Sequence, residues 1–298
     1  MIETFFKEAY GKNHIVTDHR HLLWQFKNPF TKNLSIRFIK KNRRILAALG
    51  HIPVKLSLGG KMVKSAWLAN WIVRPENRGQ GLGSSLLKGA NYAPILLASG
   101  FSAMAYSLYL RYGWSKLGFY KRLIYIGKKK KSRMIWNEPF PYREWDKAWQ
   151  EIKKGYDATT DRSSGYIKWR YLKHPFIKYH IGLMRDKGKI VGLAVIRIEK
   201  IARIIDFVAS PSYERMVIQE LFKWPVIDVY LTLDRLIRKF IKAGFKKETK
   251  KSTIPELFNP VVKPAHKKRP ILLKTVYPSV FKLKWHLVKG DGDRDRAY

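Results

Sequence analysis

The sequence predicts an α/β (α+β) protein that contains two copies of one structural unit, and three features lead to this prediction. Residues 21–30 (HLLWQFKNPF) are echoed, with one inserted residue, by residues 166–176 (YIKWRYLKHPF). A pattern typical of a β-hairpin follows each copy. Each half later contains a short helical stretch that ends in glycine and an aromatic residue, at 113–114 and 244–245. An internal repeat explains this order better than a coincidence in a tryptophan-rich chain.

The strands of the two hairpins are predicted from alternating or continuous apolar runs on either side of turn residues. Asn42, Asp186 and Gly188 lie in these turns, and such residues tolerate the positive φ that a tight hairpin needs. In the first half the strands are expected at 36–39, 45–49 and 66–73, and in the second half at 181–184, 190–195 and 202–208.

A charged run at residues 128–133 separates the two halves. It follows a strand-like segment, and Pro139 and Pro141 come soon after it, so the domain boundary is predicted there. The expected domains are residues 1–130 and residues 131–298. The length of 298 residues is compatible with two domains of ordinary size.

The composition is that of a folded protein with an anionic partner. Hydrophobic residues make up 46% of the chain and aromatic residues 14%, which is enough to fill packed cores. The absence of cysteine excludes disulfides, thiolate catalysis and cysteine metal sites, and it fits a reducing compartment. Sixty Lys and Arg against 22 Asp and Glu give a net charge of +38. The expected partner is therefore a phosphorylated small molecule, a nucleic acid or an anionic membrane leaflet.

No segment of the sequence has the character of a signal or a membrane span. The amino-terminal residues lack the basic flank and apolar stretch of a secretory signal, and no run of about 18 apolar residues could cross a bilayer. We expect a cytoplasmic protein with no transmembrane segment. Peripheral contact with the inner face of the membrane stays open as an alternative.

The strongest local signal is a strand, a glycine-rich loop and a helix in residues 71–88. Pro75 ends the strand, and Gly79, Gly81 and Gly83 let the backbone approach a ligand closely. The following helix directs its free N–H groups and its positive dipole end at the loop, which makes a cradle for an anion. The spacing fits neither a Walker loop, which needs Gly-Lys followed by Ser or Thr, nor the dinucleotide fingerprint.

Arg78-Gly-Gln-Gly81-Leu-Gly83, preceded by Val73-x-Pro75, resembles the Arg/Gln-x-x-Gly-x-Gly/Ala motif of the GNAT acyltransferase superfamily. The resemblance implies two tandem GNAT-like domains, each a mixed, mainly antiparallel sheet flanked by helices, and acetyl-CoA or another acyl-CoA as co-substrate without a metal. It also implies a set of coenzyme contacts. Ile72 and Val73 would supply a backbone N–H for the oxyanion, and the pyrophosphate would lie on Arg78, Gly79, Gln80, Gly81, Leu82, Gly83 and Ser84.

The same resemblance extends to residues 108–114 (LYLRYGW), in which Tyr109 falls on the family's tyrosine. Where that residue is catalytic, it protonates the coenzyme thiolate as the amide forms. The alternative for Tyr109 is core packing. No carboxylate stands out as a general base, and His21, His51 and His174 are interpreted as structural. About a dozen residues separate Gly83 from the next strand, so the helix between them is expected to be short.

The second half lacks the glycine loop. Its strand at 203–209 is followed by Ser210-Pro-Ser-Tyr-Glu-Arg215, so this domain is expected to be degenerate and to bind no coenzyme. The Trp-Arg-Tyr and His-Pro segments at 169–175 resemble those of two-domain GNAT-like proteins encoded among bacterial surface-polysaccharide genes. That resemblance implies an acceptor-binding wall with contacts from Trp169, Arg170, Tyr171 and Asp206. The alternative is a packed Trp and Tyr, with the Arg paired to the Asp.

Together these features favour an acyl-CoA-dependent N-acyltransferase that acts on the amine of a small anionic acceptor, such as a nucleotide-linked amino sugar. A macromolecular acceptor such as tRNA or a protein is an alternative, because basic runs occur at 40–44, 128–133, 238–251 and 263–269. A non-catalytic adaptor that binds CoA or another anion at the membrane surface is another. Asp291, Asp293 and Asp295 alternate in the tail, but the later carboxylate of a calcium loop is missing, so no metal is expected.

Overall fold

The computed structural model describes residues 2–27, 29–31, 33–249 and 270–292. Within them the α-helices are α1 (Ile2–Tyr10), α2 (His19–Phe26), α3 (Leu82–Lys88), α4 (Ala103–Arg111), α5 (Tyr142–Ile152), α6 (Ser164–Ile167), α7 (Glu214–Glu220) and α8 (Asp234–Lys242). The strands of the first half are β1 (Ile36–Lys41), β2 (Arg44–Leu58), β3 (Lys61–Val73), β4 (Ile95–Ser99), β5 (Ser115–Phe119) and β6 (Lys121–Ile126). The strands of the second half are β7 (Ile135–Trp136), β8 (Ala158–Thr160), β9 (His180–Asp186), β10 (Lys189–Ile198), β11 (Ala202–Ala209), β12 (Val226–Leu231), β13 (Lys246–Lys247), β14 (Pro270–Thr275) and β15 (Trp285–His286).

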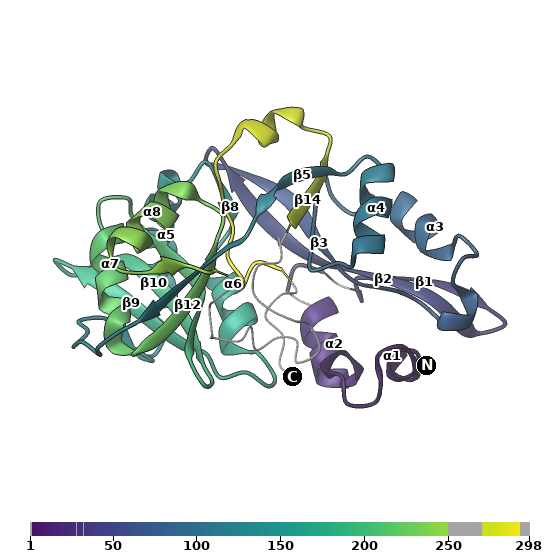
Figure 1. Cartoon of the computed structure of the whole chain (residues 1–298), viewed down its shortest axis with the longest axis horizontal. Coiled ribbons are helices and arrows are strands. Elements are labelled where there is room, and N and C mark those ends of the chain that lie inside the picture. Colours follow the sequence, from purple (N-terminus) through teal and green to yellow (C-terminus); the bar gives the residue numbers. More distant parts are fainter. Residues whose placement is uncertain (1, 28, 32, 250–269, 293–298) are drawn as a thin grey trace.

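The described strands form two mixed sheets, and each belongs to one of the two lobes seen in Figure 1. The first sheet has the order β15-β8-β2-β3-β4-β14-β5, with β1 paired to β2, and the second has the order β13-β6-β12-β11-β10-β9-β7. Most pairs are antiparallel, whereas β3–β4, β11–β12 and β8–β15 are parallel. This confirms the predicted α+β fold of two mixed, mainly antiparallel sheets flanked by helices.

Helices cover both faces of the first sheet. Phe6 of α1 and Phe26 of α2 are fully buried with Ile52 of β2, so these two helices pack on one face. Leu86 of α3 and Tyr109 of α4 are buried on the other face. Figure 1 shows α1 and α2 below the sheet and α3 and α4 above it. The site discussed below lies where the second pair of helices meets the end of β3.

The two halves repeat the same chain path, as the sequence echo predicted. The β1–β2 and β9–β10 hairpins are each followed by an antiparallel strand, β3 or β11. That strand then pairs in parallel with the next one, β4 or β12. The helices α4 and α8 then lead to Gly113 and Gly244, which have φ of 78° and 108°. Both glycines therefore hold the left-handed conformation that ends a helix.

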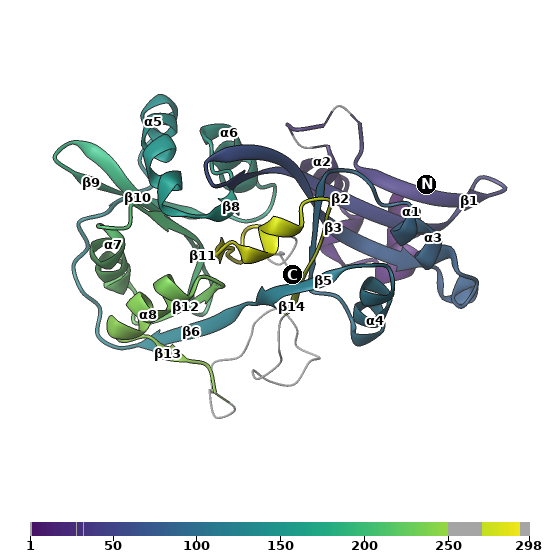
Figure 2. The same ribbon diagram turned by 90° about the horizontal axis from the view of Figure 1, so that it is seen from above.

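A late strand of each unit lies in the sheet of the other unit. Strand β6 follows β5 after the single residue Tyr120, yet it pairs with β12 and β13 of the second sheet (Figure 2). Conversely, β14 lies between β4 and β5 of the first sheet. The inserted strand is antiparallel to both neighbours in each case. The division at residues 130 and 131 stays a prediction, but the sheets do not separate there, because strands cross it in both directions.

The echoed segments meet in the core between the units. The indole Nε1 of Trp24 donates to the Trp169 carbonyl at 2.9 Å, and the Trp169 indole donates to the Trp24 carbonyl at 2.7 Å. The two rings stack with centroids 5.8 Å apart, and the Arg170 guanidinium lies 5.0 Å from the Trp24 ring. These reciprocal contacts explain why the same residue type occurs at corresponding places in both copies.

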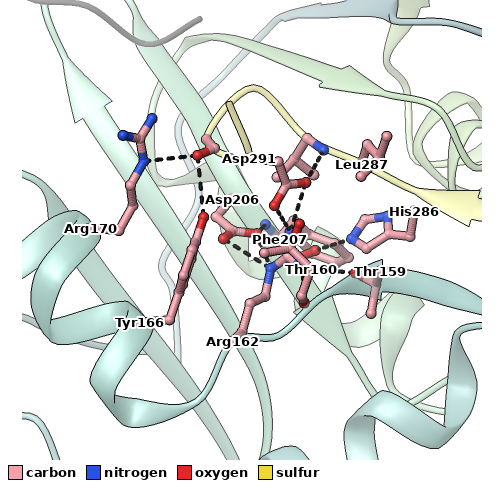
Figure 3. A network of polar contacts seen from close by, with 12 residues as sticks. Thr159, Thr160, Arg162, Tyr166, Arg170, Asp206, Phe207, His286, Leu287 and Asp291 are labelled. Carbon is pink, nitrogen blue, oxygen red and sulfur yellow. Dashed lines mark hydrogen bonds and ion pairs between the residues drawn. The ribbon is translucent and has the colours of Figure 1, made fainter. Parts of the chain in front are cut away.

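A buried ionic cluster ties the carboxy-terminal segment to the second sheet (Figure 3). Arg162, fully buried, contacts Asp206 of β11 at 2.8 Å and Asp291 at 3.0 Å. It also donates to the Thr159 hydroxyl at 2.8 Å, while Tyr171 donates to Asp206 at 2.7 Å. The hydrogen bonds satisfy most of the polar atoms of the cluster, which is what a buried charge requires.

Replacing Arg162 should destabilise the whole protein. Arg162→Ala leaves Asp206 and Asp291 buried without their cation, and the loss of one partner of a buried pair typically lowers the free energy of unfolding by about 3–5 kcal/mol. Urea unfolding followed by circular dichroism measures this loss. Lys154→Ala breaks an exposed pair with Glu151 and serves as the control, with an expected change within about 0.5 kcal/mol. Equal effects of the two variants would contradict the role of the cluster.

Buried histidines should make the protein sensitive to acid. Burial lowers the pKa of His174 to about 2, and His286, which contacts the Phe207 carbonyl at 2.8 Å, has a pKa well below its usual range for the same reason. The unfolded chain therefore binds more protons below about pH 6.5, so the free energy of unfolding decreases as the pH falls from that value.

The Nδ1 atom of His174 accepts backbone N–H bonds from Phe176 at 3.1 Å and Ile177 at 2.9 Å. An asparagine side chain can accept the same bonds without titrating. His174→Asn should therefore reduce the slope of unfolding free energy against pH, between pH 6 and pH 4, by about 1.4 kcal/mol per pH unit, the value for one proton. Urea titrations at three pH values measure the slope, and an unchanged slope would contradict a neutral His174.

Candidate active site

Strands β3 and β4 part at the point where the predicted site begins. They pair in parallel only between Ser65–Trp67 and Ile95–Leu97, after which β3 continues to Val73 alongside β2. Asn70 has φ of 51°, and the register between β2 and β3 shifts there. This is a β-bulge, which bends a strand and changes the direction of its N–H groups. The segment from Leu68 to Val73 therefore has an edge that no described strand takes up.

The glycine loop follows directly from the end of β3. A 3-10 turn at Pro75–Asn77 leads to Gly79 and Gly81, which have φ of 82° and 76°. Only glycine takes this left-handed conformation without strain, so both positions require glycine for the shape of the loop. Helix α3 then begins at Leu82 and has seven residues, which confirms the expectation of a short helix. The N–H groups of its first turn have no partner within the helix, because such groups never do.

The side chains of the loop leave its outer surface positive. Arg78 is exposed, and its Nε donates to the Val73 carbonyl at 3.4 Å. Glu76, the one acid of the loop, is neutralised by Arg44 at 2.9 Å and lies 4.0 Å from Arg74. A free carboxylate would repel a phosphate, and this pairing with two arginines offsets that effect.

The third glycine of the loop, Gly83, allows helix α3 to pack closely against the end of β3. The indole of Trp71 donates to the Gly83 carbonyl at 3.2 Å. A Cβ at Gly83 would lie 3.2 Å from a methyl carbon of Val73 and 3.3 Å from the Trp71 nitrogen. Gly83 therefore lets α3 lie directly on the end of β3. This contact fixes the start of the helix relative to the unpaired strand edge.

Tyr109 lies beside this junction. Its side chain is 3% exposed and packs against the rings of Trp71, Phe101 and Trp114, with centroids 5.3, 5.1 and 4.8 Å away. Burial raises the pKa of the Tyr109 phenol well above its usual range, so the group is protonated at neutral pH. A protonated phenol has the form that a general acid needs. The ring is also a core side chain, so packing and acid catalysis are compatible for this residue.

Of the predicted coenzyme residues, Ile72 and Val73 lie at the end of β3, where they pair with Ala48 and Ala47 of β2. The loop and helix residues 78–84 follow directly, and Trp71 connects them to Tyr109. The structure thus brings the candidate residues of the first half to one place. Trp71 was not predicted as a site residue, although its position two residues before Val73 was visible in the sequence.

The four residues expected to hold an acceptor lie in the core instead. Trp169, Arg170 and Tyr171 are 5%, 3% and 2% exposed, and Asp206 is fully buried. Arg170 donates to the Gly290 carbonyl at 2.9 Å, and Asp206 is paired with Arg162. Their polar groups bond to partners within the protein, which agrees with the packed alternative given in the sequence analysis. Their role in acceptor binding stays a prediction. The partner of Asp206 is Arg162, which was not considered, and not Arg170.

In the second unit the place that corresponds to the unpaired edge of β3 is filled by the chain itself. After Ile204 and Val229 the strands β11 and β12 also part. There Gly290 donates its N–H to the Ile205 carbonyl at 2.9 Å, and Val288 forms a bridge with Leu231 at the end of β12. The carboxy-terminal segment thus occupies this edge, which supports the expectation that the second half binds no coenzyme.

The first turn of helix α7 contains a buried carboxylate. Glu214, in its first turn, is fully buried and contacts Arg235 at 2.6 Å and Lys239 at 2.7 Å, both from α8. A carboxylate near the start of a helix occupies the favourable end of its dipole. The position that corresponds to the glycine loop therefore already has a negative group. The sequence showed Glu214 but gave no sign of its burial.

No group of three or more His, Asp or Glu side chains that could hold a metal ion occurs among the described residues. In the same part of the chain, no helix is long and apolar enough to cross a membrane. Asp291 of the alternating tail is an ion-pair partner of Arg162, while Asp293 and Asp295 lie outside the described residues. The basic run at 263–269 also lies outside them.

Comparison with known proteins agrees with this geometry. Residues 3–117 match the family model described as Acetyltransferase (GNAT) domain. The first unit is therefore similar to a GNAT domain. No curated protein matches the chain in sequence.

Solved structures resemble the whole tandem fold. A GCN5-related N-acetyltransferase from Anabaena variabilis aligns over 93% of this chain and 70% of its own, with 15% identity and a TM-score of 0.62. A protein of Enterococcus faecalis described as a probable N-acyltransferase aligns over 92% and 69%, with 11% identity and a TM-score of 0.65. Saccharomyces cerevisiae N-myristoyltransferase with bound myristoyl-CoA and inhibitors aligns over 91% and 76%, with 10% identity and a TM-score of 0.56. At these identities the likeness concerns the fold alone, and it extends over both units of the chain.

A carboxylate placed in the glycine loop should abolish coenzyme binding. Gly81→Glu puts a negative charge where the pyrophosphate is expected, so the affinity for acetyl-CoA should fall by at least tenfold in calorimetric titration. Gly188→Glu is the matched control, since Gly188 has φ of 79° in a distant hairpin and, like Gly81, nothing lies within 4 Å of an added Cβ. Both variants carry the same backbone strain and charge change. Equal affinities for the two variants would exclude the loop as the site.

Proposed function

We propose that the protein is an acyl-CoA-dependent N-acyltransferase with one coenzyme site, formed by the end of β3, the glycine loop, the start of α3 and Tyr109. The observation that carries this proposal is the junction at Trp71, which contacts Gly83 of the loop and the Tyr109 ring while it lies on the unpaired edge of β3. An anion cradle, a free strand edge and a protonated phenol lie together at this junction. A GNAT family match over the same residues supports the assignment.

Each group has a chemical task that its geometry supports. The N–H groups at the start of α3 and the Arg78 guanidinium would bind the pyrophosphate. The acyl-CoA thioester supplies the activated carbonyl that an acceptor amine attacks. A backbone N–H of Ile72 or Val73 would stabilise the negative charge that develops on the carbonyl oxygen, and the Tyr109 hydroxyl would donate its proton to the departing thiolate.

The acceptor is proposed to be a small anionic molecule that carries an amine, such as a nucleotide-linked amino sugar. The net charge of +38 supports this proposal, because a positive surface raises the local concentration of anionic substrates. An acyl group longer than acetyl is included, since one of the similar folds holds myristoyl-CoA. The second unit would contribute the wall of the acceptor site through groups other than the four buried residues named above.

Tyr109 is tested by removing only its hydroxyl. Tyr109→Phe keeps the ring among Trp71, Phe101 and Trp114, so the fold and the affinity for acetyl-CoA should not change. Turnover, measured as the release of free CoA thiol, should fall by about 10²–10⁴-fold if the hydroxyl is the general acid. Tyr106→Phe, one turn earlier on α4, is the control and should keep full turnover. Unchanged turnover in Tyr109→Phe would remove the proposed acid.

The activity itself is tested by titrating the protein with acetyl-CoA in high salt, which removes adventitious nucleic acid, and by screening amino-sugar nucleotides for acceptor-dependent CoA release. We expect saturable binding of one coenzyme per chain, because the equivalent place in the second unit is filled by residues 285–292. Two equivalents per chain would contradict the assignment of a single site. The absence of any binding by the folded protein would favour the adaptor hypothesis.

A further inference from the structure

A cavity of about 490 Å³ lies against β2 and β3, away from the glycine loop. Its lining includes Pro53 and Lys55 of β2, Lys64 and Ala66 of β3, and Ala93 ahead of β4. Its volume is that of an ordinary small-molecule pocket. Strand β3 runs seven residues from Ala66 to Val73, roughly 20 Å in an extended chain. The cavity is therefore separate from the pyrophosphate cradle.

Two lysines face each other across the wall of this cavity. Lys55 and Lys64 are direct partners in the antiparallel β2–β3 pair, so their side chains lie on the same face of the sheet. Both lysines are exposed to solvent, and neither forms an ion pair with a carboxylate of the described residues. Like charges directly opposite one another destabilise a sheet. An anion between them would turn this repulsion into attraction.

An aromatic pair next to the lysines adds two further hydrogen-bonding side chains. The His51 and Tyr92 rings stack face to face, with centroids 3.8 Å apart and planes 3° from parallel. Whereas the Tyr92 hydroxyl interacts with the Arg37 side chain, the His51 Nδ1 atom is buried and has no hydrogen-bond partner among the described residues. Leaving such a group unsatisfied typically costs about 1–3 kcal/mol. Both side chains line the cavity, so a ligand there can contact both rings.

The state of both rings suits the binding of an anion. Burial lowers the pKa of His51 to about 4, so its ring is neutral at pH 7 and carries one N–H donor and one acceptor. Burial raises the pKa of Tyr92, and the nearby Arg37 guanidinium acts in the opposite direction. The phenol therefore remains protonated and can donate. Two ammonium groups and two neutral donors thus surround a space that also has apolar walls from Phe30 and Val54.

We propose that this cavity binds a small molecule through a phosphate group, with Lys55 and Lys64 as its counterions and with His51 and Tyr92 as hydrogen-bond partners. Lysine ammonium groups bind phosphate as compact point charges. The volume of the cavity admits a sugar-sized molecule, whereas a nucleic acid needs an extended basic groove. The apolar walls would contact the rest of the ligand. Identifying this ligand with the anionic acceptor rests on the proposed function.

The test measures binding separately from turnover. Wild-type protein is titrated by calorimetry, at constant ionic strength, with inorganic phosphate and with glucosamine 6-phosphate as probes. We expect saturable binding of one molecule per chain, tighter for the sugar phosphate because it also meets the apolar walls. The double variant Lys55→Gln/Lys64→Gln should weaken binding at least tenfold, and Tyr92→Phe should weaken it severalfold.

Lys147→Gln/Lys189→Gln removes the same charge from exposed positions on α5 and β10 and is the matched control. Its affinity should equal that of the wild type. An equal loss in both double variants would show a general effect of charge and overturn the proposal, as would the absence of saturable binding. Thermal melting without ligand gives a second measurement. Lys55→Gln/Lys64→Gln should be at least as stable as wild type, because it relieves a like-charge pair.

The two proposals fail in different ways. Protein that binds acetyl-CoA but neither phosphate probe would overturn the cavity proposal and leave the acyltransferase proposal intact. Protein that binds the sugar phosphate but not acetyl-CoA would overturn the acyltransferase proposal and leave the cavity proposal intact. The cavity would then be an anion site independent of acyl transfer. Acceptor-dependent CoA release that is lost in Lys55→Gln/Lys64→Gln, with acetyl-CoA affinity unchanged, would support both and would identify the cavity ligand with the acceptor.

Discussion

The reciprocal exchange of β6 and β14 is the constraint on which the rest of the structure depends. Each strand completes the sheet of the other unit, antiparallel to both of its neighbours, so neither sheet keeps its full set of hydrogen-bonded strands without the other half of the chain. An exposed pair of sheet edges is avoided in this way. The reciprocal indole bonds between Trp24 and Trp169 add a fixed contact at the centre of the pair. The two units therefore form one structure, in which neither sheet is complete without a strand from the other unit.

Within this shared arrangement the two halves differ at one place, where β3 separates from β4 in the first half and β11 separates from β12 in the second. In the first half a glycine loop and a short helix adjoin the unpaired strand edge. In the second half the carboxy-terminal segment covers that edge, and it is held there by Arg162 through Asp291. A buried ion cluster is a poor source of net stability but a strong source of specificity, because only one arrangement satisfies all of its charges. One half of the chain has thus kept an open strand edge, and the other has filled it with its own residues.

Much of the first-half site was visible in the sequence, since it depends on local features. Gly79 and Gly81 need positive φ, and the short spacing to the next strand limits the length of α3. Tyr109 was found through its motif, whereas its burial among three rings was not. For Trp169, Arg170, Tyr171 and Asp206 the sequence left two alternatives open, because aromatic and charged residues serve equally well in a ligand site and in a buried network; their burial agrees with the second. The contact of Arg162 with Asp206 and the burial of the other three side chains became visible only in the folded chain.

The sequence by itself determined the repeat, the α+β class and the glycine loop ahead of a short helix, because periodicity, turn residues and glycine conformations act between neighbours along the chain. The tertiary structure alone decided which strands belong to which sheet, which acids are buried and which lysines share a cavity. Strand β6 looks like the end of the first unit in sequence, and Lys55 and Lys64 look like two ordinary surface residues nine positions apart. Strand pairing decides where β6 belongs and that the two lysines are neighbours. Hydrogen bonds between strands bring together residues whose contact cannot be read from their spacing along the chain.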